Sequence, residues 1–284
     1  MARNLHKYEE LTPWEFDQEK AHASIIYAAV GPVEFHEESS VLGFDPCKAY
    51  QWCLDAAAVT GGIVFPMIPF APDGPRPFMT REQIRERAAQ PCTSEYCTLP
   101  GGYPSIYSSR ELCCQLYKEL MENFAVDLKF KLCVFLGGHQ PAGNMLKDIV
   151  MEVSGPDGII ESGKRTFVGT FKGMRIMAVG SLDYNRDLVA DYYEKNGIKR
   201  VQHGGLWETA INYAINPEYF QEKYLDETKY PQHYGALKDE YFEGCLRPVK
   251  AEYKKLTPEF ARLMYDTSLQ RMIEAVKKNY CELV

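Results

Sequence analysis

Short apolar runs alternate with longer amphipathic stretches along this chain. Residues 23–31, ASIIYAAVG, are almost wholly apolar, which is typical of a strand buried on both faces. Asp45-Pro46 then predicts the start of a helix, since Asp is a good N-cap and Pro fits a first turn. Further strands are predicted at 62–70, 130–138 and 173–181, and helices at 45–60, 108–125, 141–153, 186–197, 207–215 and 257–280.

This alternation predicts an α/β fold, in which a mostly parallel central sheet lies between two helical layers as an α/β/α sandwich. Two segments interrupt the alternation. Residues 69–102 are rich in Pro and Gly and predict an insertion with one short helix at 80–90. Residues 154–173 predict a hairpin with turns at 156–158 and 162–163. We therefore expect a single domain, 1–284, that carries this insertion.

The composition of the chain bears on its partners and on its cellular compartment. The chain has 284 residues, 45% of them hydrophobic, and a net charge of -7 without a basic cluster, which disfavours a nucleic-acid partner. Its nine cysteines include no CxxC pair and several lie in apolar runs, as expected for buried thiols in a reducing compartment. The polar N-terminus and the absence of long apolar runs predict a cytoplasmic protein with no membrane association.

Histidines and carboxylates gather in three predicted strand-to-helix turns. In an open α/β sheet such turns lie beyond the carboxyl ends of the strands, where ligands collect. Mixed imidazole and carboxylate groups suit Zn, Mn or Fe better than Ca or Mg. The residues concerned are Glu34, His36, Asp45, His139, His203 and Glu208.

Each of these groups also has a simpler interpretation. Glu34 and His36 are compatible with a surface loop, and Asp45 with a helix cap alone. His139 follows two glycines and is compatible with a turn residue, and Trp207 with a core residue. What favours a metal site is that all three groups occupy the same kind of turn.

Three motifs, in order along the chain, resemble those of the creatininase (creatinine amidohydrolase) family. They are EFH at 34–36 followed by Asp45, GGHQPAGN at 137–144, and HGGLWETA at 203–210. The segment TLPGGYPSIYSSREL at 98–112 is similar to the family's Phe-Pro-Gly-Thr segment before a helix.

The resemblance implies a creatininase-like three-layer fold with two divalent metal ions, Zn, Mn or Fe. Glu34, His36, Asp45 and His139 would be metal ligands, with Asp45 bridging the ions. Glu208 would be a fifth ligand or an acid/base, and His203 would either support the ligands from outside the metal site or act as a proton donor. For the substrate pocket we name Tyr96, Gln140 and Trp207 as candidates. The resemblance also implies a homo-oligomer, for which the hexamer is the family's common form.

The sequence departs from the family pattern around this site. A second family histidine after Glu34 is missing, because the chain reads Phe35-His36-Glu37-Glu38-Ser39. Tyr96 replaces a family histidine, and Gln140-Pro141 replaces the Tyr-Glu of true creatininases. The ligands are kept but the pocket is altered, which disfavours creatinine itself as the substrate.

We therefore expect a metal-dependent hydrolase that uses a metal-activated water on a small cyclic amide or carbonyl substrate. One alternative is a hydrolase that opens a ring carbon–carbon bond of a keto-cyclitol, similar to 3-dehydro-scyllo-inosose hydrolase. A second is a non-catalytic binding protein that kept the fold, and a third is a metal-dependent isomerase or lyase. The sequence leaves these alternatives open.

Overall fold

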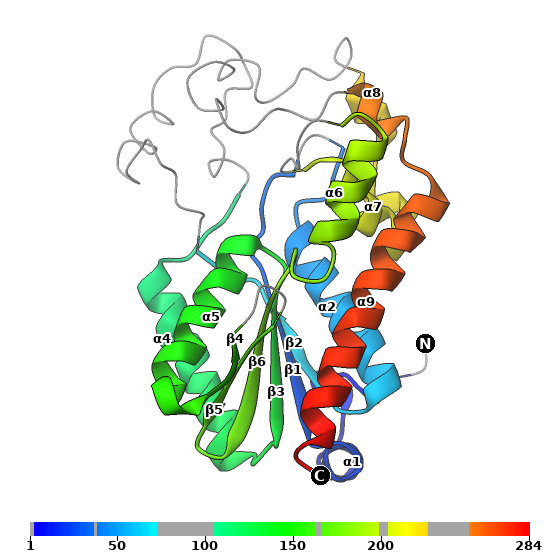
Figure 1. Cartoon of the computed structure of the whole chain (residues 1–284). Coiled ribbons are helices and arrows are strands. Elements are labelled where there is room, and N and C mark those ends of the chain that lie inside the picture. Colours follow the sequence, from blue (N-terminus) through cyan, green and yellow to red (C-terminus); the bar gives the residue numbers. More distant parts are fainter. Residues whose placement is uncertain (1–2, 37–38, 73–104, 163–165, 199–203, 227–249) are drawn as a thin grey trace.

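The computed structural model places one twisted sheet between two layers of helices (Figure 1). None of the helices it describes is long and apolar enough to cross a membrane. The described residues are 3–36, 39–72, 105–162, 166–198, 204–226 and 250–284.

The sheet has six strands in the order β2-β1-β3-β6-β5-β4. The first four are parallel, and β5 and β4 are antiparallel to their neighbours. The predicted α/β fold with a mostly parallel sheet is therefore confirmed. The strands are β1 (Ile25–Val30), β2 (Ile63–Ile68), β3 (Leu132–Gly137), β4 (Ile159–Ser162), β5 (Phe167–Phe171) and β6 (Met174–Gly180).

The helices divide between the two faces of the sheet. Four of them share a core with one face, namely α2 (Phe44–Thr60), α6 (Arg186–Lys195), α7 (Leu206–Ile215) and α9 (Pro258–Cys281). The other face is covered by α4 (Arg110–Glu122) and α5 (Gln140–Ser154). The remaining elements are α1 (Pro13–His22), α8 (Lys250–Tyr253), η1 (Tyr8–Glu10), η2 (Asn123–Asp127), η3 (Pro156–Gly158), η4 (Pro217–Tyr219) and η5 (Glu222–Leu225).

Strand β1 explains why the central strands are apolar throughout. Ile25, Tyr27 and Ala29 enter the core beneath α2 and α9, whereas Ile26 and Ala28 enter the core beneath α4 and α5. Because helices cover both faces, neither set of alternating side chains meets water. The strand therefore has no polar position until the chain leaves the sheet.

Some sequence expectations differ from the structure. Helix α1 was not predicted, although Thr12 and Glu15 form a complete capping box at its start. The expected turn at 156–158 is η3 and connects α5 to β4, so it does not join two strands of a hairpin. The 80–90 helix and most of the 69–102 insertion lie outside the described residues, as do residues 163–165.

Two glycines let the sheet edge press against the start of α2. A Cβ built on Gly138 would lie 2.0 Å from the backbone carbonyl oxygen of Asp45, and one on Gly31 would lie 2.8 Å from the Pro46 nitrogen. Neither distance is compatible with a real side chain. The ends of β1 and β3 thereby fix where the first turn of α2 lies.

Gly138→Ala tests this contact. The added methyl group must push α2 away from the sheet, so we expect the free energy of unfolding to fall by about 3 kcal/mol or more. Gly43→Ala, at the start of the same helix, is the control, because its Cβ would meet only Cys47 Sγ at 3.4 Å. The control should lose less than about 1 kcal/mol. Equal urea midpoints for the two variants would contradict the close-contact explanation.

Candidate metal centre

Five metal-capable side chains meet beyond the carboxyl ends of β1 and β3. Glu34 and His36 lie in the loop after β1, and Asp45 lies in the first turn of α2. His139 is the N-cap residue between β3 and α5, and Glu208 lies in the first turn of α7. All five are buried. Segments far apart in the sequence thus converge at one edge of the sheet.

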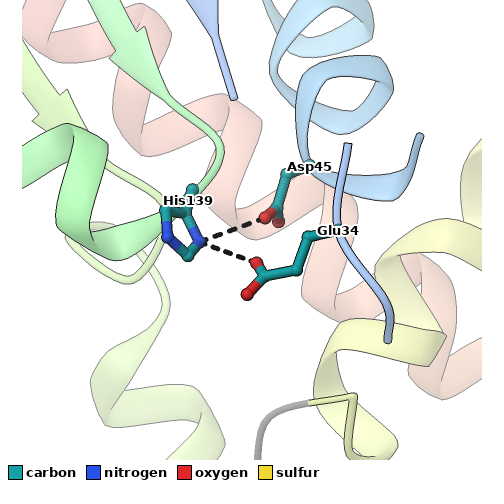
Figure 2. A group of neighbouring side chains, drawn as sticks. All are labelled: Glu34, Asp45 and His139. Carbon is teal, nitrogen blue, oxygen red and sulfur yellow. Dashed lines mark ion pairs between the residues drawn. The ribbon is translucent and has the colours of Figure 1, made fainter. Parts of the chain in front are cut away.

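The first group of three consists of Glu34, Asp45 and His139 (Figure 2). The Nδ1 atom of His139 lies 2.9 Å from Glu34 Oε2 and 3.3 Å from Asp45 Oδ2. Four ligands at about 2.1 Å around a tetrahedral ion are about 3.4 Å apart. This spacing and the carboxylate–imidazole donor set therefore fit one divalent ion.

The second group consists of His36, Asp45 and Glu208. The Nε2 atom of His36 lies 3.4 Å from Asp45 Oδ1 and 4.0 Å from Glu208 Oε2. Asp45 thus presents Oδ2 to the first group and Oδ1 to the second. In each group the candidate ligand atoms all lie within 4.8 Å of one another.

Neighbouring groups hold these carboxylates in place. The hydroxyl of Tyr107 donates a 2.6 Å hydrogen bond to Glu34 Oε1. The backbone N–H of Gly204 donates a 2.6 Å hydrogen bond to Glu208 Oε2. A carboxylate fixed by one oxygen keeps its orientation without an ion, so the site is largely preorganised.

The electrostatics of the site favour charged side chains despite burial. Burial lowers the pKa of His36 and of His139, but the adjacent carboxylates outweigh it and raise the two values to about 9 and about 10. Asp45 loses hydration, which raises its pKa, yet the positive charges of His36 and Lys48 hold that pKa well below its usual range. The side chains therefore form a buried network of opposite charges.

Lys48 and Tyr107 were not identified from the sequence. Lys48 is fully buried in α2, and its Nζ lies 3.3 Å from Asp45 Oδ1. A lysine three residues after Asp45, on a helix that otherwise carries several Ala and Cys residues, was the available signal. Tyr107 follows the Pro/Gly-rich segment, and nothing local distinguishes it from other tyrosines.

Two of the three residues proposed for the substrate pocket lie in the part of the chain that the structure describes. Gln140 opens α5 next to His139 and donates a 3.0 Å hydrogen bond to Asn144. Trp207 is buried in α7, and its ring lies 5.6 Å from Lys48 Nζ. His203 and Tyr96 lie outside the described residues, as do Glu37 and Glu38.

Several solved creatininase structures resemble this chain over almost its whole length. Creatinine amidohydrolase (creatininase) matches with a TM-score of 0.66 and 14% identity over 97% of this chain and 98% of that chain. A structure described as "Creatininase Mn" matches with a TM-score of 0.66, 14% identity and the same coverage. A mutant creatininase of "Zn-Zn type" has a TM-score of 0.67 and 13% identity over 98% of this chain and 99% of that chain.

Because the sequence identities are low, the structural likeness shows the fold of the chain, which is that of creatininase, and not its activity. The expected creatininase-like architecture is thereby confirmed. No protein-family model matches the sequence, and no curated protein matches it. Activity and ligand roles therefore depend on the site itself.

The metal-free protein should contain two histidines with strongly raised pKa values. After chelation, we expect His36 and His139 to titrate near 9 and 10, whereas an unperturbed imidazole titrates near about 6.5. Because protonation is tighter in the folded state, the two residues contribute full stability below about pH 6.5, and this contribution disappears as pH rises through 9 to 10.

Nitrogen-detected NMR of the imidazole rings measures these pKa values directly. His36→Gln and His139→Gln assign the two signals, each by the loss of one titration curve. Titration of both rings at or below the ordinary value would contradict the proposed charge network.

Proposed function

We propose that this protein is a creatininase-like, metal-dependent hydrolase that acts on a small cyclic amide or carbonyl substrate. The observation that carries the proposal is the buried group of Glu34, Asp45 and His139, whose atoms are spaced for one divalent ion. The creatininase fold supports the proposal, since solved creatininases with this fold are described as manganese and zinc forms.

Glu34, Asp45 and His139 would hold the ion, and His36 and Glu208 extend the site to a second position. A divalent ion bound there supplies Lewis acidity, which lowers the pKa of a water molecule and polarises a carbonyl. Mixed oxygen and nitrogen donors suit Zn, Mn or Fe. Burial of the ligands keeps bulk water from competing with the substrate.

The residues of the chain have distinct proposed roles. Tyr107 holds Glu34 by its hydrogen bond, and this leaves Oε2 to face His139. Glu208 either extends the ligand set or carries a proton between water and the leaving group. His203, which lies outside the described residues one position before Gly204, is the proposed proton donor to the leaving nitrogen or carbon.

The substrate pocket is proposed from Tyr96, Gln140 and Trp207. Gln140 directly follows His139 in the sequence and donates a hydrogen bond to Asn144, and a Cβ on Gly180 would lie 3.0 Å from Gln140 Nε2 and 3.3 Å from Asp183 Oδ2. These polar groups favour, as a second candidate, a polyhydroxylated keto-cyclitol whose ring carbon–carbon bond is hydrolysed.

The resemblance also supports the proposal that this chain forms a homo-oligomer, with the hexamer as the form to test. Light scattering coupled to gel filtration measures it, independently of activity.

His139→Ala should abolish both metal content and turnover, because it removes the only imidazole of the first group. We expect the bound metal measured by elemental analysis to fall and turnover to decrease at least about 100-fold. His22→Ala, an exposed histidine at the end of α1, is the control and should change neither. A fully active His139→Ala protein without metal would contradict the proposal.

Substrate class is tested by supplying the metal-loaded protein with lactams and with keto-cyclitols. Turnover of lactams alone supports the amide hydrolase, and turnover of keto-cyclitols alone supports the second candidate. In heavy-oxygen water a hydrolase must place solvent oxygen in the product. Conversion without such labelling would identify an isomerase or lyase, and a metal-free, inactive protein would identify a binding protein.

A further inference from the structure

Lys48 is a fully buried cation in contact with the candidate metal centre. Its Nζ lies 3.3 Å from Asp45 Oδ1, 4.2 Å from the centre of the Phe44 ring and 5.6 Å from that of the Trp207 ring. One carboxylate oxygen and two aromatic rings thus surround the ammonium group. These contacts keep the charge at a fixed position beside Asp45.

Burial of a lysine here is costly for the fold. An apolar side chain of similar length fills such a position at lower cost in stability than a buried ion pair. The neighbouring core positions of α2 follow that pattern, since Ala49, Trp52 and Cys53 are apolar or nearly so. A charge at Lys48 therefore requires an explanation beyond packing.

The oxygen that Lys48 contacts is also the one offered to the second group. Asp45 Oδ1 lies 3.4 Å from His36 Nε2, and Glu208 Oε2 lies 4.0 Å from the same nitrogen. A divalent ion held by His36, Asp45 and Glu208 would share Oδ1 with the ammonium. Two cations on one carboxylate oxygen repel each other strongly in a buried site.

The charges of the site also disfavour a second divalent ion beside the ammonium of Lys48. Glu34, Asp45 and Glu208 supply three negative charges, and the ligating imidazoles are neutral. With one divalent ion in the first group, the ammonium of Lys48 and a protonated His36 leave one excess positive charge among the described residues. A second divalent ion would leave the buried site with two excess positive charges.

We infer that the Lys48 ammonium takes the electrostatic place of a second divalent ion, so that the chain binds one ion tightly, at Glu34, Asp45 and His139. This inference rests on the proposed metal-dependent function and changes the expected number of ions. Lys48 is a positioning residue here, because it acts through its ion pair with Asp45.

Lys48→Met tests the inference, because methionine keeps the length of the side chain and removes the charge. Each protein is saturated with Zn or Mn at neutral pH, freed of excess metal by gel filtration and analysed for metal per chain. We expect about one ion in the unmodified protein and about two in K48M. In titrations, K48M should bind its second equivalent at least tenfold more tightly than the unmodified protein does.

Lys147→Met is the matched control, because Lys147 forms its ion pair, at 2.7 Å, with Asp183, which belongs to neither metal-capable group. It should retain one ion. Lys48→Gln serves as a second variant if K48M does not fold, as judged by circular dichroism.

Two tightly bound ions in the unmodified protein would overturn the role of Lys48 and leave the metal-dependent function intact. A single ion in folded K48M and K48Q would also overturn it. No metal in any protein, including the unmodified one, would overturn both the inference and the proposed function.

Discussion

The site depends on where the carboxylate of Asp45 is held. Its two oxygens face different partners, Oδ2 toward His139 and Oδ1 toward His36 and Lys48. Gly138 packs against the backbone of the same residue, at a distance that no other amino acid permits. Asp45 therefore connects the sheet edge, the start of α2 and both metal-capable groups. A shift of this one turn would separate both groups at once.

The architecture explains why scarce polar side chains can lie in a buried position. Strands β1 and β3 are parallel neighbours, so their carboxyl ends meet at one edge, and the apolar core ends where those strands end. Helices α2 and α7 begin at this edge, and each contributes a carboxylate from its first turn, where the helix dipole favours negative charge. The charges of histidine, lysine and carboxylate then compensate one another away from water.

The central strands and most of the candidate metal ligands could be predicted from the sequence. Strands buried on both faces must be continuously apolar, so β1, β3 and β6 were recognisable from composition alone. The segments after β1 and β3 carry Glu34, His36, Asp45 and His139, and the start of α7 carries Glu208. The structure brings these five side chains together.

Other features were not accessible because they depend on contacts between distant segments. The burial of Lys48 against Asp45 and Trp207 depends on the packing of α2 beside α7, which the sequence pattern of α2 alone does not show. The partnership of Tyr107 with Glu34 joins residues 73 positions apart. Helix α1 was missed although its capping box was readable, since its apolar pattern is weak. The most direct test of the account is anomalous diffraction at the metal absorption edge from metal-replete crystals. The account predicts a strong peak between Glu34, Asp45 and His139, and a peak elsewhere or no peak would contradict it.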